Sequence, residues 1–504
     1  MMALLGSFLL LNMVSWLLQH NLQPSILRPS HRKLRLWILD NVILAVPFLI
    51  ILLLTQRILL ATLGSLALLI TLFIINQAKF KALREPLVFS DFYLYLQIFT
   101  HPRLFLPFLN IPLTLAAITA GILALVIILK FEPASSLQSI PIFLTVISAA
   151  VFAWGSVEKI LLKHHAIEDV QALGLFNSLL ISSIQAAKSR RRIKLHEKLN
   201  ELSPYSSDIF SAKTHQADFI VIQSESFCDI RSIHPSIKGD VLQHYDRICQ
   251  NSVAYGPVAV PAWGANTLRT EFAFLSGIDN ALLEHYRYNP YQFIDKPLPT
   301  LASVLQKQGY HTVCIHPNHA EFFKRDKVYP LLGFDQFIDI EAFTEAHKEG
   351  PYISDQAVTD KLINLLSNRI TDKPLFIFVI TMENHGPLHL ENYEQKDIDA
   401  FYSETPPQQH HDLTIYLKHL KNADIMLDQI TRYLRKSPIH THLCWYGDHV
   451  PSMPAVYDEL KVEHLDSHYI IWNNYQAMSD QSQPANNSSI KIELLSRQLV
   501  NAKC

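Results

Sequence analysis

The sequence has few cysteines and no cysteine pattern. Only five occur in 504 residues, and no two of them form a CxxC pair. A disulfide framework is therefore not indicated. Cys314 and Cys444 lie inside apolar, strand-like runs, where we expect small buried hydrophobic side chains and no redox chemistry.

The sequence also lacks an excess of charge of either sign. It has 43 Lys and Arg against 45 Asp and Glu, so bulk binding to nucleic acid has no support. The first 155 residues carry very little charge. We expect no cleavable signal peptide, since the first apolar stretch has neither a basic start nor a small-residue exit. Internal repeats and low-complexity tracts are absent from the sequence.

The chain is too long for a single core, and its first part consists of long apolar runs. Residues 58–75 and 108–129 contain no charge and are long enough to cross a hydrocarbon layer of roughly 30 Å. Three further candidates are 3–18, 37–55 (with Asp40 near one end) and 138–154. These runs predict a transmembrane domain over 1–155 with about five helices.

The charge distribution leaves the orientation in the membrane open. With five spans and an inside N-terminus, everything after residue 155 lies outside the cytoplasm. The basic loop 28–35 then lies outside too, against the positive-inside tendency. Four spans, or an outside N-terminus, satisfy that tendency but leave the C-terminal part inside. Residues 156–213 are predicted as a juxtamembrane helical connector, whose basic run 188–194 fits a solvated helix face or a patch on anionic headgroups.

From residue 214 the pattern changes to short apolar runs, rich in β-branched residues, between helical segments. The apolar runs are 218–223, 311–316, 375–381 and 441–446, and the helical segments include 298–310, 354–368 and 413–436. This alternation predicts an α/β domain with a mainly parallel sheet between helices. We place this domain at 214–485, with a polar surface loop at 480–489 and a C-terminal tail at 486–504.

Polar side chains follow each of the four predicted strands. They are Glu225 after the first, His316 at the end of the second, His385 after the third, and Asp448 and His449 after the fourth. Ligands bind beyond the carboxyl ends of strands in open α/β sheets, so we expect these side chains at one edge. Taken singly, Glu225 fits a surface or capping carboxylate, and each lone histidine fits a bond to a loop carbonyl. Their coincidence favours a site.

Between the first two strands, the stretch GANTLRTEF (264–272) predicts a turn followed by a helix. Thr267 then lies at or near a helix N-terminus. It fits an ordinary N-cap, or a hydroxyl that binds a metal ion, which lowers its pKa while the helix end favours a phosphate. The donor set would be Glu225, Thr267, Asp448 and His449. Three oxygen donors and one imidazole suit a single Mn²⁺, with Zn²⁺ or Mg²⁺ as alternatives.

Five motifs occur in order over about 214–475. They are SESF (224–227), GANTLRTEF (264–272), HPNHAEFFKRDKVYPLLGFD (316–335), TMENHGP (381–387) and YGDHVP (446–451). Behind a multi-span membrane part, this series resembles the lipoteichoic acid synthase and phosphoglycerol transferase family, within the sulfatase and alkaline-phosphatase-like superfamily. The segment 76–91 also resembles the polar loop among that family's membrane helices.

The resemblance implies a helical transmembrane bundle followed by a sulfatase-like domain. It implies that Glu225, Thr267, Asp448 and His449 hold the metal and that Thr267 is the nucleophile. It assigns contacts with the phosphoglycerol group to His316, Arg325 and His385, and Arg325 can hold phosphate oxygens bidentately. It further implies a bacterial plasma-membrane (inner-membrane) protein whose catalytic domain is extracytoplasmic, or periplasmic. The implied donor is phosphatidylglycerol, and the implied acceptor is a glycan or polymer.

Two departures from the family pattern bear on the substrate. Phe323 stands where lipoteichoic acid synthases tend to have Trp, so we expect a different contact on the glycerol side. GANTLRTEF looks closer to Gram-negative transferases of the glucan-modifying type than to Gram-positive polymerases. Three alternatives stay open: a phosphoethanolamine transferase, which tends to use zinc and a disulfide-rich domain; a hydrolase that passes the intermediate to water; and an inactive membrane scaffold.

Overall fold

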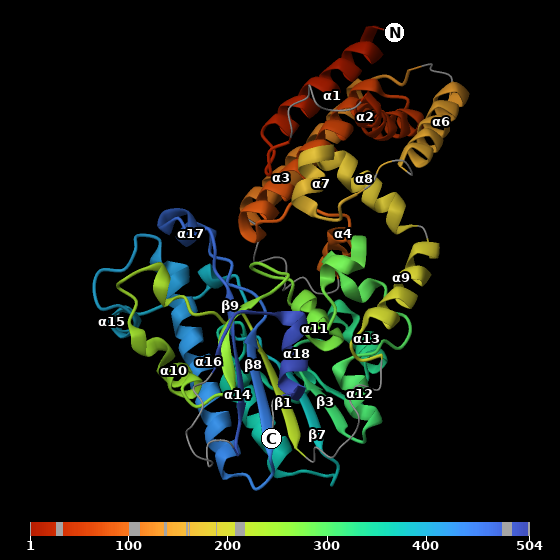
Figure 1. Ribbon diagram of the computed structural model, residues 1–504. Helices are drawn as coiled ribbons and strands as arrows, with labels where there is room; N and C mark the ends of the chain where they lie inside the picture. Colours follow the sequence, from red (N-terminus) through yellow and green to blue (C-terminus); the bar gives the residue numbers. More distant parts are fainter. Residues whose placement is uncertain are drawn as a thin grey trace. The chain divides into compact units, whose positions relative to one another are not determined.

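The structure is a computed structural model of the chain (Figure 1). It describes residues 2–26, 34–99, 111–135, 139–157, 160, 162–187, 189–206, 217–475 and 486–501. The chain divides into two compact units, Met1–Arg191 and Arg192–Cys504, which we call the membrane unit and the sheet unit and describe separately. Their boundary falls within the predicted connector, 156–213.

All secondary structure in the described residues of the membrane unit is helical. Its α-helices are α1 (Met2–His20), α2 (Leu34–Thr55), α3 (Ile58–Leu83), α4 (Asp91–Tyr95), α5 (Ile111–Phe131), α6 (Ser139–Val157), α7 (Ala166–Leu173) and α8 (Leu175–Ala186). Five of them, α1, α2, α3, α5 and α6, are long and apolar enough to cross a membrane. This confirms the predicted number of spans. Residues 108–110, residue 138 and most of the basic loop lie outside the described residues.

The predicted polar loop, 76–91, is helical in its first half, because α3 extends to Leu83. Lys79 is buried, and its Nζ lies 2.6 Å from both Glu85 Oε1 and Asp91 Oδ2. Asn76 Oδ1 accepts a hydrogen bond from the backbone N–H of Leu87 at 2.9 Å. Buried charges persist where they are paired, so these bonds explain how a charged segment packs among apolar helices.

The sheet unit alternates strands with helices. Its strands are β1 (Asp218–Ser224), β2 (Ala254–Ala259), β3 (His311–Ile315), β4 (Gln336–Ile338), β5 (Lys348–Glu349), β6 (Tyr352–Ile353), β7 (Leu375–Ile380), β8 (Thr441–Gly447), β9 (Ser467–Asn473), β10 (Asn486–Asn487) and β11 (Ile490–Lys491). Its α-helices are α10 (Gln243–Cys249), α11 (Thr267–Ser276), α12 (Leu301–Lys307), α13 (Arg325–Leu332), α14 (Asp355–Ser367), α15 (Gln395–Phe401), α16 (His410–Lys436), α17 (Pro454–Leu460) and α18 (Ile492–Asn501), with α9 (Ser189–Leu202) leading into the unit.

The large sheet has the order β10-β2-β9-β8-β1-β7-β3-β4, with β11 also beside β2. Strand β9 is antiparallel to β2 and β8, and the other pairings of this sheet are parallel. The predicted, mainly parallel sheet is therefore confirmed. The four predicted strands are consecutive neighbours in the order β8-β1-β7-β3, so their carboxyl ends meet at one edge.

Helices cover both faces of this sheet (Figure 1). Alternate residues of β1 serve the two faces: Ile220 and Ile222 join one core with α10, α14 and α16, while Phe219 and Val221 join the other with α11, α12, α13 and α18. Burial on both faces explains why the central strands read as continuous apolar runs. Cys314 and Cys444 are buried in the second core, as predicted.

Sequence reasoning missed some elements. Strand β2 contains Gly256 and Pro257, two residues that are depleted in strand interiors, and β9 went unrecognised although it contains the apolar run 469–472. The polar loop predicted at 480–489 is wrong for Asn486 and Asn487, which form β10. Residues 476–485 lie outside the described part of the chain.

Candidate metal centre and catalytic site

Two neighbouring strands bring the carboxylates of Glu225 and Asp448 together. In the pairing of β1 with β8, Ser224 lies opposite Gly447, so Glu225 and Asp448 are the next residues on adjacent parallel strands. A Cβ atom on Gly447 would lie 1.9 Å from the carbonyl oxygen of Phe227. Only glycine therefore fits at the end of β8, which makes the close approach of the two loops possible.

Glu225, Asp448 and His449 form a buried group, which we call the His449 cluster. One ligand atom from each residue lies within 4.8 Å of the others. The Nε2 atom of His449 lies 3.3 Å from Glu225 Oε1 and 3.3 Å from Asp448 Oδ2. Its Nδ1 lies 3.0 Å from the carbonyl oxygen of Val450. Donation from Nδ1–H to that carbonyl leaves Nε2 with a lone pair facing the carboxylates.

The donor atoms of the His449 cluster fit a divalent cation. Glu225 Oε2, Asp448 Oδ2 and His449 Nε2 are buried and have no hydrogen-bond partner. Burial, and then the charge of Asp448, raise the pKa of Glu225 to about 8. Two buried carboxylates with unpartnered oxygens are costly without a compensating positive charge. Two carboxylates and one imidazole that converge in this way are typical metal ligands.

Thr267 is the first residue of α11, as predicted. Asn266 precedes it at the N-cap position with φ 73°, so Thr267 is not the N-cap. Two bonds join the segment around Thr267 to the loop that carries Asp448. The N–H of Gly264 donates to the carbonyl oxygen of Val450 at 3.1 Å, and Thr270 Oγ1 donates to that of Asp448 at 2.6 Å.

Ser226 contacts all three residues of the His449 cluster, and sequence reasoning missed it. Its N–H donates to Asp448 Oδ1 at 2.8 Å, its Oγ donates to Glu225 Oε1 at 3.0 Å, and its Oγ lies 3.3 Å from His449 Nδ1. Its φ of 54° lies in the left-handed region, which costs a residue with a Cβ about 1–2 kcal/mol. Strain of this kind concentrates at functional sites.

The two predicted substrate histidines are held through Nδ1. His316 is buried, and its Nδ1 lies 3.3 Å from the carbonyl oxygen of Ile380. His385 is half-buried, with Nδ1 2.7 Å from the carbonyl oxygen of Gly386 and 3.1 Å from the hydroxyl of Tyr352. Burial, and then the charge of Arg325, hold the pKa of His316 well below its usual value, and burial lowers the pKa of His385. Both rings are therefore neutral near pH 7.

Arg325 begins α13 and is fully buried. Its Nε lies 3.2 Å from Glu271 Oε1 and its Nη2 lies 2.8 Å from Glu271 Oε2, while its Nη1 has no hydrogen-bond partner. The ring of Phe323 stacks on the guanidinium, with 5.1 Å from Arg325 Cζ to the ring centroid. The residue that departs from the family pattern thus covers Arg325.

A second group, largely buried, includes Glu383, which follows the neighbouring strand β7, and sequence reasoning did not single it out. In this His419 cluster, Nδ1 of His419 lies 2.9 Å from Glu383 Oε1 and Nε2 lies 3.0 Å from Glu391 Oε2. Burial lowers the pKa of His419, but the bonds to Glu383 and Glu391 outweigh it and raise that pKa to about 9. Nearby, Thr381 Oγ1 accepts a hydrogen bond from the N–H of Glu225 at 2.9 Å.

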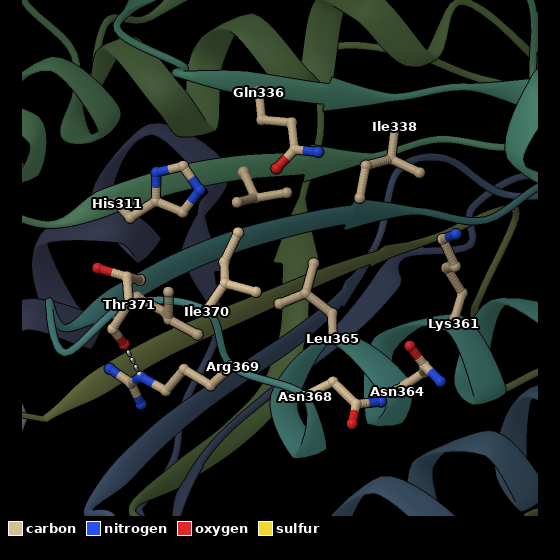
Figure 2. Close-up of a pocket in the computed structure, with 12 residues that line it drawn as sticks. His311, Gln336, Ile338, Lys361, Asn364, Leu365, Asn368, Arg369, Ile370 and Thr371 are labelled. Atoms are coloured by element: carbon tan, nitrogen blue, oxygen red, sulfur yellow. Dashed lines mark hydrogen bonds between the residues drawn. The ribbon is translucent and has the colours of Figure 1, made fainter.

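A pocket lies at the amino-terminal ends of β3, β4 and β7 (Figure 2). Its lining residues are His311, Val313, Gln336, Ile338, Lys361, Asn364, Leu365, Asn368, Arg369, Ile370, Thr371 and Leu375. Glu225, Asp448 and His449 follow the carboxyl ends of β1 and β8. The pocket therefore lies at the opposite end of the strands from the candidate metal centre.

The mainly parallel sheet between helices and the buried carboxylate and imidazole donors at its edge define an α/β protein with a candidate metal site. The sequence model of the Sulfatase family matches residues 217–494, which are more than half of the 504 residues. The chain belongs to this family. With its five apolar helices, it is a membrane protein.

Curated relatives agree with this assignment. A putative cyclic beta-1,2-glucan modification protein from Rhizobium meliloti is 29% identical over 280 residues, 52% of this chain and 43% of that protein. The capsular polysaccharide biosynthesis protein RkpI from Rhizobium meliloti is 28% identical over 426 residues, 79% of this chain and 74% of that protein. Lipoteichoic acid synthase from Staphylococcus aureus is 28% identical over 163 residues, 31% of this chain and 24% of that protein.

The first of these relatives is thus more than twice as long as the part that this chain matches. Among solved structures, the integral membrane protein lipooligosaccharide phosphoethanolamine transferase A (EptA) from Neisseria meningitidis has a TM-score of 0.54 at 12% identity. The match covers 85% of this chain and 81% of that chain. This likeness shows the fold. The predicted sulfatase-like fold and the resemblance to the lipoteichoic acid synthase group are confirmed.

Proposed function

We propose that the chain transfers a phosphoglycerol group from phosphatidylglycerol to a hydroxyl of a glycan or polymer. The observation that carries this proposal is the His449 cluster, whose three unpartnered donor atoms converge beside the helix that begins at Thr267. Glu225, Asp448 and His449 would hold one divalent ion, Mn²⁺ in our assignment, with Thr267 as the fourth ligand. A bound ion supplies the positive charge that lowers the pKa of the Thr267 hydroxyl.

The reaction would be a double displacement. Thr267 Oγ attacks the phosphorus, the bond from phosphorus to the diacylglycerol oxygen breaks, and a phosphoglyceryl-threonine forms. Neutral His316 or His385 can take the proton of Thr267 Oγ at Nε2 and pass it to the leaving diacylglycerol oxygen, and in the second step take the proton of the entering hydroxyl and return it to Thr267. Arg325 faces the negative charge of the phosphoryl group. An acceptor hydroxyl then attacks the same phosphorus and regenerates Thr267.

The glycan acceptor is supported by the names of two relatives, one a glucan modification protein and the other a capsular polysaccharide biosynthesis protein. The membrane helices would keep the site close to its lipid donor, which raises the local donor concentration. The proposed location of the sheet unit is the extracytoplasmic, periplasmic side of a bacterial inner membrane. Reporter fusions after residue 160 that are active only in the cytoplasm would refute that orientation.

Phosphoethanolamine transfer is the second candidate, supported by the fold shared with EptA. The cysteines favour phosphoglycerol transfer. Cys228, Cys249, Cys314 and Cys444 are all free and buried, whereas phosphoethanolamine transferases, as the resemblance implies, tend to have a disulfide-rich domain.

Mass spectrometry of Thr267 after exposure to a bacterial lipid extract decides between the candidates, because the mass of the adduct names the transferred group. Thr267→Ala should carry no adduct and release no diacylglycerol from labelled phosphatidylglycerol. Turnover by that variant would remove Thr267 as nucleophile. Free glycerol phosphate as the main product would indicate a hydrolase.

A further inference from the structure

Glu271 lies one helical turn after Thr267 on α11 and is completely buried. Its Oε1 accepts hydrogen bonds from Arg325 Nε and from the hydroxyls of Tyr291 and Tyr329, and its Oε2 accepts from Arg325 Nη2. Four donor atoms from three residues therefore meet at one carboxylate: Arg325 and Tyr329 come from α13, and Tyr291 comes from the segment Pro290–Gln292. None of these contacts involves the His449 cluster.

The contacts with Glu271 fix the orientation of the Arg325 guanidinium. Glu271 occupies one edge of Arg325, formed by Nε and Nη2. On the other edge, formed by Nη1 and Nη2, Nη1 is buried and has no hydrogen-bond partner. A guanidinium has five N–H donors in a rigid plane, so fixing one edge also fixes the direction of the other. Arg325 is bonded to Glu271, one helical turn after Thr267 on α11, which places the guanidinium beside the candidate site.

We propose that Glu271 is a positioning residue, which holds Arg325 so that its Nη1/Nη2 edge receives a phosphoryl oxygen pair. The proposal rests on the proposed function insofar as a phosphoryl group binds beside Thr267. Because Glu271 and Thr267 belong to the same helix, one rigid element sets both the nucleophile and the anion receptor. Phe323 adds to this by packing its ring on the guanidinium.

The alternative is that Glu271 only neutralises a buried charge and stabilises the fold. The chain offers a matched pair for comparison, Asp218 and Arg369, at the start of β1. Asp218 is buried, with Arg369 Nη1 2.8 Å from its Oδ2 and Nη2 3.2 Å from its Oδ1. This pair lies at the opposite end of β1 from Glu225, so its loss should weaken the fold without changing anion binding.

The test measures the affinity of the purified, Mn²⁺-loaded full chain for inorganic phosphate by calorimetry, with thermal unfolding in parallel. We expect Arg325→Ala to weaken phosphate binding most, and Glu271→Gln to weaken it by about 10-fold. Glu271→Gln added to Arg325→Ala should have no further effect, because Glu271 acts through Arg325. Asp218→Asn should lower the unfolding temperature and leave phosphate affinity unchanged.

Tyr329→Phe serves if Glu271→Gln does not fold, since it keeps both charges and removes one donor to Glu271. It should weaken phosphate binding by about 3-fold. Unchanged phosphate affinity in Glu271→Gln and Tyr329→Phe would overturn the proposal, and so would absence of phosphate binding by the wild type. Failure of the proposed function gives a different pattern: phosphate binding depends on Glu271, but phosphatidylglycerol is not consumed.

Discussion

Two clusters of carboxylates around an imidazole lie beyond the carboxyl ends of neighbouring strands, the His449 cluster after β1 and β8 and the His419 cluster beside the end of β7, and their polar atoms find partners in different ways. In the His419 cluster, both ring nitrogens face carboxylates, and Glu383 also accepts from the backbone of Asp355 at 2.6 Å. In the His449 cluster, one atom of each residue has no partner. The same residue types are thus paired with one another in the His419 cluster and leave atoms without partners in the His449 cluster. A protonated imidazole offsets part of the negative charge of the first cluster, whereas the donor atoms of the second fit a cation from outside.

The largest effect should come from Asp448→Asn, which removes one charge from the His449 cluster. We expect turnover to fall by about 10³-fold, since a bound metal is worth several kcal/mol of transition-state stabilisation. In chelator, the variant should unfold at a temperature no lower than the wild type, because it relieves the repulsion between Asp448 and Glu225. A large loss of stability in chelator would contradict the comparison.

The next largest effect should be on the free energy of unfolding, through the protonation of His419. The pKa of this ring rises from 6.5 to about 9 in the folded chain. A raised pKa contributes stability that is fully present below pH 6.5 and is lost as the pH rises through 9. At about 1.4 kcal/mol per unit, the contribution is of the order of 3 kcal/mol. Chemical unfolding between pH 6 and 10 should show this decline in the wild type, and His419→Gln should be less stable at pH 6 and show a flatter profile.

Removal of the metal should change the unfolding temperature through the His449 cluster and not through the His419 cluster. A ligand at a hundredfold excess over its Kd stabilises the folded state by about 2.7 kcal/mol, so chelation should lower the unfolding temperature of the wild type. Asp448→Asn should respond little, and His419→Gln should respond as the wild type does. Calorimetry with added Mn²⁺ provides the measurement. An equal response in Asp448→Asn would show that the ion binds elsewhere.

The smallest effect concerns Ser226. Both Ser226→Ala and Ser226→Gly remove its hydroxyl contacts with Glu225 and His449, and we expect each to weaken metal binding by about 10-fold. Glycine tolerates the left-handed conformation, so Ser226→Gly should be more stable than Ser226→Ala by about 1 kcal/mol. Urea unfolding of the two variants gives this difference, and the opposite order would argue against strain at this position.

The sequence was most informative where local pattern and topology coincide. The strands that precede Glu225, His316, His385 and Asp448 are buried on both faces, so each reads as a short apolar run with a polar side chain just after it. Because ligands bind beyond the carboxyl ends of parallel strands, these polar side chains are predicted to lie at one edge of the sheet. Thr267 could be placed because a turn signal stands directly before an amphipathic helix.

The parts that could not be predicted depend on partners far away in the chain. Glu271 reads as an ordinary helix residue until Arg325 and the two tyrosines are brought against it by other segments. Glu383 lies inside the motif TMENHGP (381–387), but its bond to His419 links positions 36 residues apart. The left-handed φ of Ser226 has no sequence signal, because serine takes that conformation only when its surroundings require it.

Gly447 has a practical consequence for mutational scans of this chain. A Cβ atom at this position would lie 1.9 Å from the carbonyl oxygen of Phe227, which excludes every side chain, so all nineteen substitutions should score as inactive. A scan that reads only growth or product would then rank Gly447 beside Asp448 as a reactive position, although it offers no functional group. Measuring the amount of folded protein for each variant would tell a steric requirement apart from a chemical one.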